Sequence, residues 1–136
     1  KYIGIRGCME LATKEALKTV KHLILPGNQI ADEGLEALAE SPYLKNLELL
    51  NANHNEIGDD GAIAIANSES LPNLKDLSMF GNVIGDRGAQ ALADSPQSKK
   101  YLKLDLYKNQ YSRIGYKALT ESENLKNCEE LEVYRE

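Results

Sequence analysis

The stretch LKDLSMFGNVIGDRGAQALA, residues 74–93, determines the fold, because it is one copy of a unit that recurs along the chain. The preceding copy is LELLNANHNEIGDDGAIAIA, residues 47–66. Asparagine and glycine return at a 27-residue step, as Asn28, Asn55, Asn82 and Asn109 and as Gly7, Gly34, Gly61, Gly88 and Gly115. Agreement of two residue types over so many copies indicates a repeat architecture.

Each unit combines a short strand with a helix. In residues 47–66, Leu50 and Ala52 alternate with polar positions, which is typical of a strand with one buried face. Ala62, Ile65 and Ala66 follow at the i, i+3, i+4 spacing of one helical stripe. Because so small a unit cannot bury its own apolar face, we expect successive units to stack and share one core.

Acidic residues recur at the start of the predicted helices. Asp32, Asp59 and Asp86 fall where a carboxylate can accept hydrogen bonds from the free N–H groups of a helix start. The pairs Asp32-Glu33 and Asp59-Asp60 could also be interpreted as acid/base groups or calcium ligands. Their repetition at the helix start favours capping.

Two units depart from the pattern. In the fourth, Tyr111 takes an isoleucine position and Ser112-Arg113 replaces Gly-Asp, so we expect a distorted turn there, with Ser112 capping the helix instead. In the first, Lys14-Glu15 replaces a Ser-Pro stop, so we expect the opening helix to continue towards Lys18.

The quoted segments resemble leucine-rich repeats of the ribonuclease-inhibitor-like class, in which LxxLxLxxN leads into an IGDxG turn and an amphipathic helix. The resemblance covers essentially the whole chain. It implies an α/β fold, a right-handed solenoid with a parallel β-sheet on the concave face and helices on the convex face. It also implies a hydrogen-bonded ladder formed by Asn28, Asn55, Asn82 and Asn109.

On this basis, residues 1–136 are expected to form a single domain of about five 27-residue repeats. Polar capping units are not visible at either end of the sequence. Because an open end exposes core and strand edge, we expect a segment of a longer protein, or ends that associate with a neighbouring chain.

Composition disfavours several classes of function. Sixteen basic and 21 acidic residues give a net charge of -5, and the basic residues are scattered, so nucleic acid is not an expected partner. No apolar run approaches the roughly 18 residues of a membrane-spanning helix, so no membrane association is expected.

Residues that could carry out chemistry are few. His22 and His54 fall at different positions of neighbouring units, without a companion cluster, so we expect no metal. Cys8 and Cys128 are too far apart for a disulfide, and free thiols favour a cytoplasmic location, or a host cell's cytoplasm if the chain is a bacterial effector. Since nucleophile and phosphate-loop motifs are absent from the sequence, we expect neither an enzyme nor a cofactor.

The strand positions that point away from the core form the candidate binding surface. Phe80, Tyr107 and Tyr134 occupy one such position on three successive strands, about 4.8 Å apart. Exposed aromatic rings of this kind anchor protein interfaces, whereas rings that only cover neighbouring backbone would bind nothing. The predicted partner-binding residues are Phe80, Tyr107, Tyr134, Asp76, Asp105, Glu130, Glu132, Lys103, Asn51, Asn53 and His22.

The sequence therefore predicts a protein–protein interaction module whose aromatic and acidic C-terminal half suits a partner with basic and apolar groups. One alternative is a structural or self-associating segment of a larger repeat protein, which the open ends favour. Another is a GTPase regulator, which the resemblance allows but which would need a catalytic loop outside the regular units. The 27-residue spacing never slips, so the sequence contains no such loop.

Overall fold

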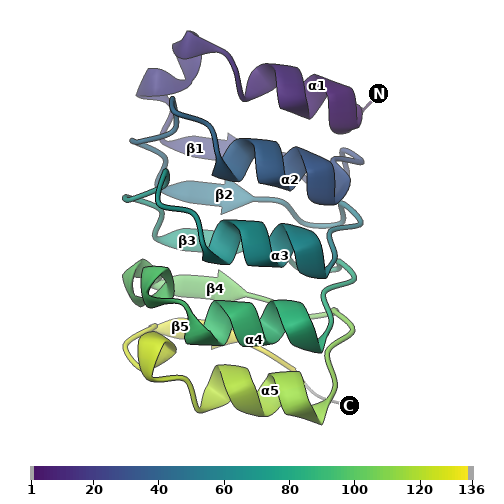
Figure 1. The fold of residues 1–136 in the computed structure, drawn as a ribbon, viewed down its shortest axis with the longest axis vertical. Helices are drawn as coiled ribbons and strands as arrows, with labels where there is room; N and C mark the ends of the chain where they lie inside the picture. Colours follow the sequence, from purple (N-terminus) through teal and green to yellow (C-terminus); the bar gives the residue numbers. More distant parts are fainter. Residues whose placement is uncertain (1, 135–136) are drawn as a thin grey trace.

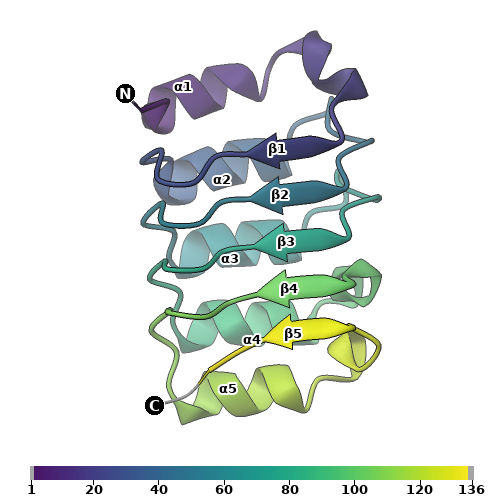
Figure 2. The same cartoon turned by 180° about the vertical axis from the view of Figure 1, so that it is seen from behind.

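The computed structural model describes residues 2–134, which form a sheet layer and a helix layer (Figures 1 and 2). The strands are β1 (His22–Ile24), β2 (Leu49–Asn51), β3 (Asp76–Ser78), β4 (Lys103–Asp105) and β5 (Glu130–Glu132). The α-helices are α1 (Gly4–Leu11), α2 (Ala31–Ala39), α3 (Asp59–Ala66), α4 (Asp86–Asp94) and α5 (Arg113–Thr120). The 3-10 helices are η1 (Glu15–Thr19), η2 (Pro96–Lys100) and η3 (Glu123–Leu125).

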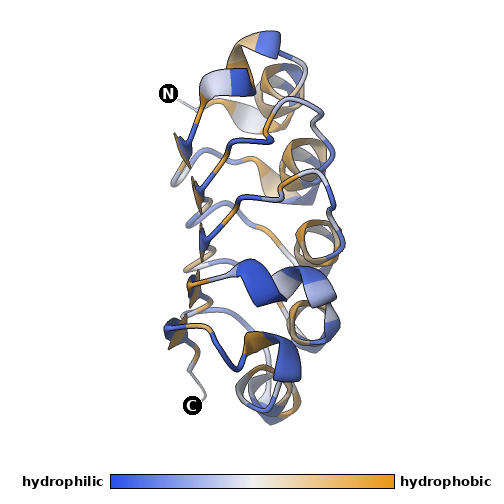
Figure 3. Ribbon diagram, turned by 90° about the vertical axis from the view of Figure 1, so that its left-hand side faces the viewer, coloured by the Kyte–Doolittle hydropathy of each residue, from blue (hydrophilic) through white to orange (hydrophobic). Residues whose placement is uncertain are grey.

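The strands form one parallel sheet in the order β1-β2-β3-β4-β5. Residues one repeat apart are direct partners in it, so that Leu50 pairs with Leu77 and Leu77 with Leu104. These central leucines are fully buried and face the helices, and apolar residues line the interior between the two layers (Figure 3). The predicted fold class, an α/β solenoid with a parallel sheet on one face and helices on the other, is confirmed.

The helices bury the stripe that their spacing predicts. Ala62, Ile65 and Ala66 of α3 are fully buried, and α3 packs against both α2 and α4. Alanine lets the helix approach the sheet closely, while each buried isoleucine or leucine contributes about 1.5–3 kcal/mol. Stacking therefore supplies the apolar burial that one unit lacks.

Asparagine side chains join consecutive units in the turns after β1, β2, β3 and β4. Asn82 Oδ1 accepts hydrogen bonds from the N–H groups of Asn55, at 2.8 Å, and Ile57, at 3.0 Å, both in the preceding unit. Its Nδ2 donates to the carbonyls of Ala52 and Met79. Asn82 is buried, so these bonds replace the water that the amide has lost.

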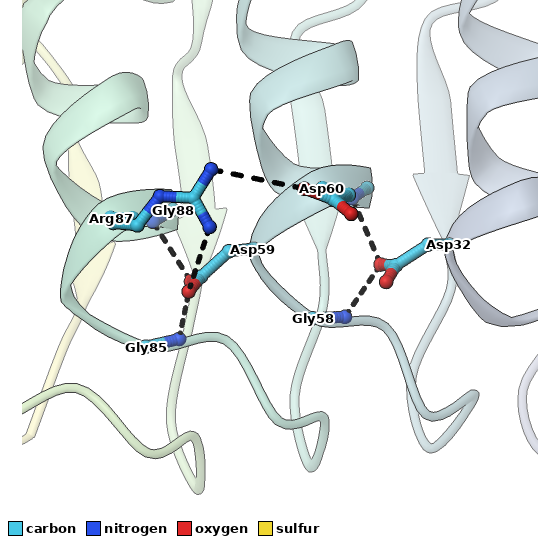
Figure 4. Close-up of polar contacts among 8 residues, drawn as sticks. Asp32, Gly58, Asp59, Asp60, Gly85, Arg87 and Gly88 are labelled. Carbon is cyan, nitrogen blue, oxygen red and sulfur yellow. Dashed lines mark hydrogen bonds and ion pairs between the residues drawn. The ribbon is translucent and has the colours of Figure 1, made fainter.

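Aspartate side chains join units at the helix starts, but not in the way the sequence suggested. Asp59 Oδ1 accepts from the N–H groups of Gly85, at 2.8 Å, and Gly88, at 2.9 Å (Figure 4). Asp32 and Asp86 make the equivalent bonds to the units that follow them. Each aspartate thus caps the helix of the next unit, and the prediction that it caps its own helix is wrong.

This arrangement explains the glycine in the first turn of α3, α4 and α5. A Cβ atom on Gly61 would lie 2.7 Å from Asp32 Oδ1. On Gly88 it would lie 2.9 Å from both Asp59 Oδ1 and the Ala62 side chain. Glycine is therefore needed for the capping carboxylate and the neighbouring helix to approach.

Serine side chains join units at the opposite ends of the helices. Ser41 Oγ donates to the carbonyl of Ala12, at 2.6 Å. The last carbonyls of a helix have no partner within it, so this bond fills a vacant acceptor. The equivalent pairs are Ser68 with Ala39, Ser95 with Ala66 and Ser122 with Ala93.

The turn of the fourth unit keeps the regular backbone. Ser112 has φ -90° and ψ -166°, close to the extended conformations of Gly58 and Gly85, so the predicted distortion is wrong. The predicted cap is confirmed, because Ser112 Oγ accepts from the N–H of Ile114. The same hydroxyl donates to Asp86 Oδ2 at 2.6 Å and thereby lowers the pKa of that carboxyl.

The first unit differs from the expectation at the end of its helix. α1 ends at Leu11, and the chain turns at Lys14 before it enters η1, so the predicted continuation towards Lys18 is wrong. The N–H of Lys14 bonds to the carbonyl of Leu11, which closes a tight turn where the helix would otherwise extend.

The start of α2 shows what happens without the capping aspartate. Ile5 holds the position in the first unit that Asp32 holds in the second, so no carboxylate of residues 2–134 takes this place at α2. Ala31, which occupies the position of Gly58, has φ +55°, and its N–H bonds to the carbonyl of Asn55. A non-glycine residue in this left-handed region is strained.

We expect Asp59→Ala to lower the free energy of unfolding by about 1–2 kcal/mol, because it removes the cap of α4. Asp60→Ala is the matched control, since the exposed Asp60 carboxylate makes only a 3.9 Å ion pair with Arg87. Urea denaturation measures both. Equal effects of the two substitutions would contradict the inter-repeat cap.

We expect Ala31→Gly to raise the free energy of unfolding by roughly 0.5–1 kcal/mol, since glycine tolerates φ +55°. Ala64→Gly, within α3, should lower it by about 1 kcal/mol because its backbone is helical. Thermal denaturation of both variants tests this opposition of sign. Destabilisation by Ala31→Gly would contradict the strain.

Candidate functional site

The outward positions of the sheet form three rows that cross the strands on the face drawn in front in Figure 2. Row one is His22, Leu49, Asp76, Lys103 and Glu130. Row two is Ile24, Asn51, Ser78, Asp105 and Glu132. Row three continues beyond the strands with Pro26, Asn53, Phe80, Tyr107 and Tyr134.

A shallow groove follows rows one and two. Its volume is about 420 Å³, and it extends from β2 to β5. The lining residues are Leu49, Leu50, Asn51, Asp76, Ser78, Lys103, Asp105, Glu130 and Glu132. It thus brings together six of the predicted partner-binding residues, whereas His22 lies on β1, outside the groove.

The charge of the groove is negative. Among residues 2–134, Lys103 is its one cation, placed between Asp76, at 4.0 Å, and Glu130, at 3.8 Å. Both distances are long and the lysine is half exposed, so each pair contributes at most about 1 kcal/mol. Asp105 and Glu132 add two further negative charges.

Row three contains two aromatic pairs instead of one continuous stripe. Tyr107 and Tyr134 meet edge to face, with ring centroids 5.7 Å apart. Phe80 instead contacts the His54 ring, at 5.2 Å. Tyr134 is 52% exposed, whereas Phe80 and Tyr107 are partly buried.

Neighbouring polar groups fix the backbone beneath these rings. Asn53 Oδ1 accepts from the N–H of Phe80 at 2.8 Å and from Ser78 Oγ at 2.6 Å. Asp105 Oδ1 accepts from the N–H of Tyr107 at 3.0 Å. Asn53 is therefore occupied in holding the sheet face, although it was predicted to contact a partner.

Sequence reasoning missed two residues of this surface. His54, considered only as a metal ligand, has φ +56° and packs against Phe80. Tyr111, considered only as a departure from the repeat, donates its hydroxyl to the carbonyl of Leu106 and accepts from the N–H of Tyr134. The signal for Tyr111 was the hydroxyl itself, since a buried phenol needs a hydrogen-bond partner.

The cysteine side chains are the candidate nucleophiles among residues 2–134. Cys8 and Cys128 are free, and burial raises the pKa of Cys8 to about 11 and also raises that of Cys128. Raised values disfavour the reactive thiolate. This part of the chain contains no group of three or more potential metal ligands. None of its helices is long and apolar enough to cross a membrane.

Comparison with known proteins identifies the family. The Leucine Rich repeat profile matches residues 16–39, 43–66 and 70–93, more than half of the chain. The chain belongs to the leucine-rich repeat family. Its repeats are of the ribonuclease-inhibitor-like class, as the sequence predicted. No curated protein matches the sequence.

Two solved structures show the leucine-rich repeat fold of this chain. Leiomodin-1 Actin-Binding Site 2 aligns with a TM-score of 0.74 and 20% identity, over 95% of this chain and 78% of that one. A tropomodulin C-terminal domain from Caenorhabditis elegans aligns with a TM-score of 0.71 and 14% identity, over 96% of this chain and 82% of that one. At these identities the likeness concerns the fold alone.

We expect Gly81→Ala to displace the His54 ring, because a Cβ atom there would lie 2.3 Å from it. Gly27→Ala is the matched control, since Gly27 has a similar positive φ but nothing within 4 Å of its added Cβ. The NMR shifts of the His54 ring protons, on a ring whose centroid lies 5.2 Å from that of Phe80, should change only in Gly81→Ala. An unchanged shift would refute this packing.

Proposed function

We propose that this leucine-rich repeat chain is a protein-binding module and that its partner lies on the sheet face over β3 to β5. The observation that carries the proposal is the Tyr107–Tyr134 pair beside an acidic groove on that face. Tyrosine provides a large contact area and is enriched at binding hot spots. The leiomodin-1 domain of similar fold is named as an actin-binding site, which supports a protein as the class of partner.

Rigidity of the surface supports the same function. The backbone under the rings is held by Asn53, Asp105 and the Tyr111 hydroxyl. A surface that is already ordered loses less conformational entropy on binding. Net charge -5 disfavours nucleic acid, and the two free thiols support a cytoplasmic location.

A random 12-residue peptide library displayed on phage tests the proposal with the chain as bait. We expect selected peptides to bind at least about tenfold more weakly to Tyr107→Ala/Tyr134→Ala, because this variant removes the aromatic anchor. Tyr2→Ala/Ile114→Ala is the matched control, since it removes two exposed apolar side chains elsewhere. Its binding should equal that of the wild type.

Circular dichroism should show the same fold for all three proteins. Peptides that bind the tyrosine variant as tightly as the wild type would contradict a site at these rings. Failure to enrich any peptide above the background of an unrelated bait would contradict the binding module itself.

A further inference from the structure

Two carboxylates on the sheet face lie side by side on neighbouring strands. Asp105 of β4 and Glu132 of β5 are direct register partners, on strands about 4.8 Å apart. Within residues 2–134 neither takes part in an ion pair. Like charges directly opposite each other on a sheet destabilise it, so the fold gains nothing from this juxtaposition.

The adjacent row shows how the same strands balance charge. There Lys103 stands between Asp76 and Glu130 and lies within 4.0 Å of each. Row two has no basic residue on any of its five strands. A cation of a bound partner would balance the charge of Asp105 and Glu132, as Lys103 balances the charge of Asp76 and Glu130.

The tyrosine pair lies immediately beyond these carboxylates on the same two chain segments. Tyr107 follows Asp105 by two residues, and Tyr134 follows Glu132 by two. The two rings meet at 73°, so they present an edge and a face at adjacent positions. A planar cation can stack on a tyrosine face while its N–H groups reach a carboxylate.

The carboxylates of Asp105 and Glu132 can accept further hydrogen bonds. Asp105 Oδ1 accepts from the Tyr107 N–H, and no hydrogen bond is made to Oδ2 by residues 2–134. Glu132 is exposed at the end of the groove. The groove continues from here past Ser78 to Asn51, which gives an extended segment polar contacts along its length.

We propose that Asp105, Glu132, Tyr107 and Tyr134 form a receptor for one arginine side chain of an extended partner segment that crosses the groove. This inference rests on the proposed function and names the chemistry of its partner. Arginine fits better than lysine, because its planar fork can bind a carboxylate through two hydrogen bonds and stack on a ring at once. An acidic partner segment would be repelled.

Three phage-displayed nonapeptide libraries test the proposal, with the central residue fixed as arginine, lysine or glutamine. We expect the immobilised wild-type chain to retain the arginine library at least about tenfold above the glutamine library, with the lysine library between them. On Asp105→Asn/Glu132→Gln the arginine preference should disappear.

Asp94→Asn/Glu121→Gln is the control matched in charge, because both residues are exposed at the C-terminal ends of α4 and α5. It should keep the arginine preference. Asp105→Asn/Glu132→Gln should melt at the same temperature as the wild type or higher, since it relieves a repulsion. Lower melting of that variant would indicate a structural role and overturn the proposal.

The remaining outcomes separate this inference from the proposed function. Equal retention of the three libraries, with loss of binding on Tyr107→Ala/Tyr134→Ala, would overturn the arginine receptor and leave the binding module standing. If the wild type retained none of the libraries better than Tyr107→Ala/Tyr134→Ala does, both the arginine receptor and the binding module would be overturned. If Asp105→Asn/Glu132→Gln still retained the arginine library above the glutamine library, the arginine would bind elsewhere, and the inference would also be overturned.

Discussion

Neighbouring repeats supply hydrogen-bond partners for backbone groups at the turns and at the helix ends. Asn82 accepts from two N–H groups of the unit before it, and Asp59 accepts from two N–H groups of the unit after it. Ser41 donates to a carbonyl of the unit before it. Buried polar groups without partners are costly, so these bonds make stacking in register a condition of folding.

The same constraint positions the candidate site. Since the polar bonds and the leucine column fix the register, residues one repeat apart must lie side by side on the sheet face. The residue types at the outward positions differ from unit to unit. Aromatic and acidic residues at these positions therefore form rows, which is how Asp105 meets Glu132 and Tyr107 meets Tyr134.

The repeat period predicted the sheet, the helices and their buried stripes, because these depend on which residue types recur. It did not reveal which helix each capping aspartate serves. A carboxylate at a helix start can cap that helix or another, and the choice at Asp59 depends on packing against Gly88 in the next unit. The turn at Ser112 was predicted to distort, yet extended φ and ψ values suit serine as well as glycine. The local sequence therefore left these features open.

The sequence predicted which residues share a row of the sheet face, but not which rings contact each other. A row of rings at equal spacing suggested one stripe, but Phe80 turns to His54 and Tyr107 to Tyr134. Which neighbour a ring contacts depends on side-chain rotamers and on loop residues such as His54, which has a positive φ. Tyr111 gained its role in the same way, through a contact with a backbone N–H 23 residues away.

Native-state hydrogen exchange tests the inter-repeat bonds most directly. The amides of Ile57 and Ile84 lie in turns after the strands, and within residues 2–134 each is bound only by an asparagine side chain of the next unit. If these bonds hold the stack together, both amides exchange only on global unfolding, with the same free energy as the amides of β3. Exchange of Ile57 and Ile84 at the rate of unprotected loops would contradict the account.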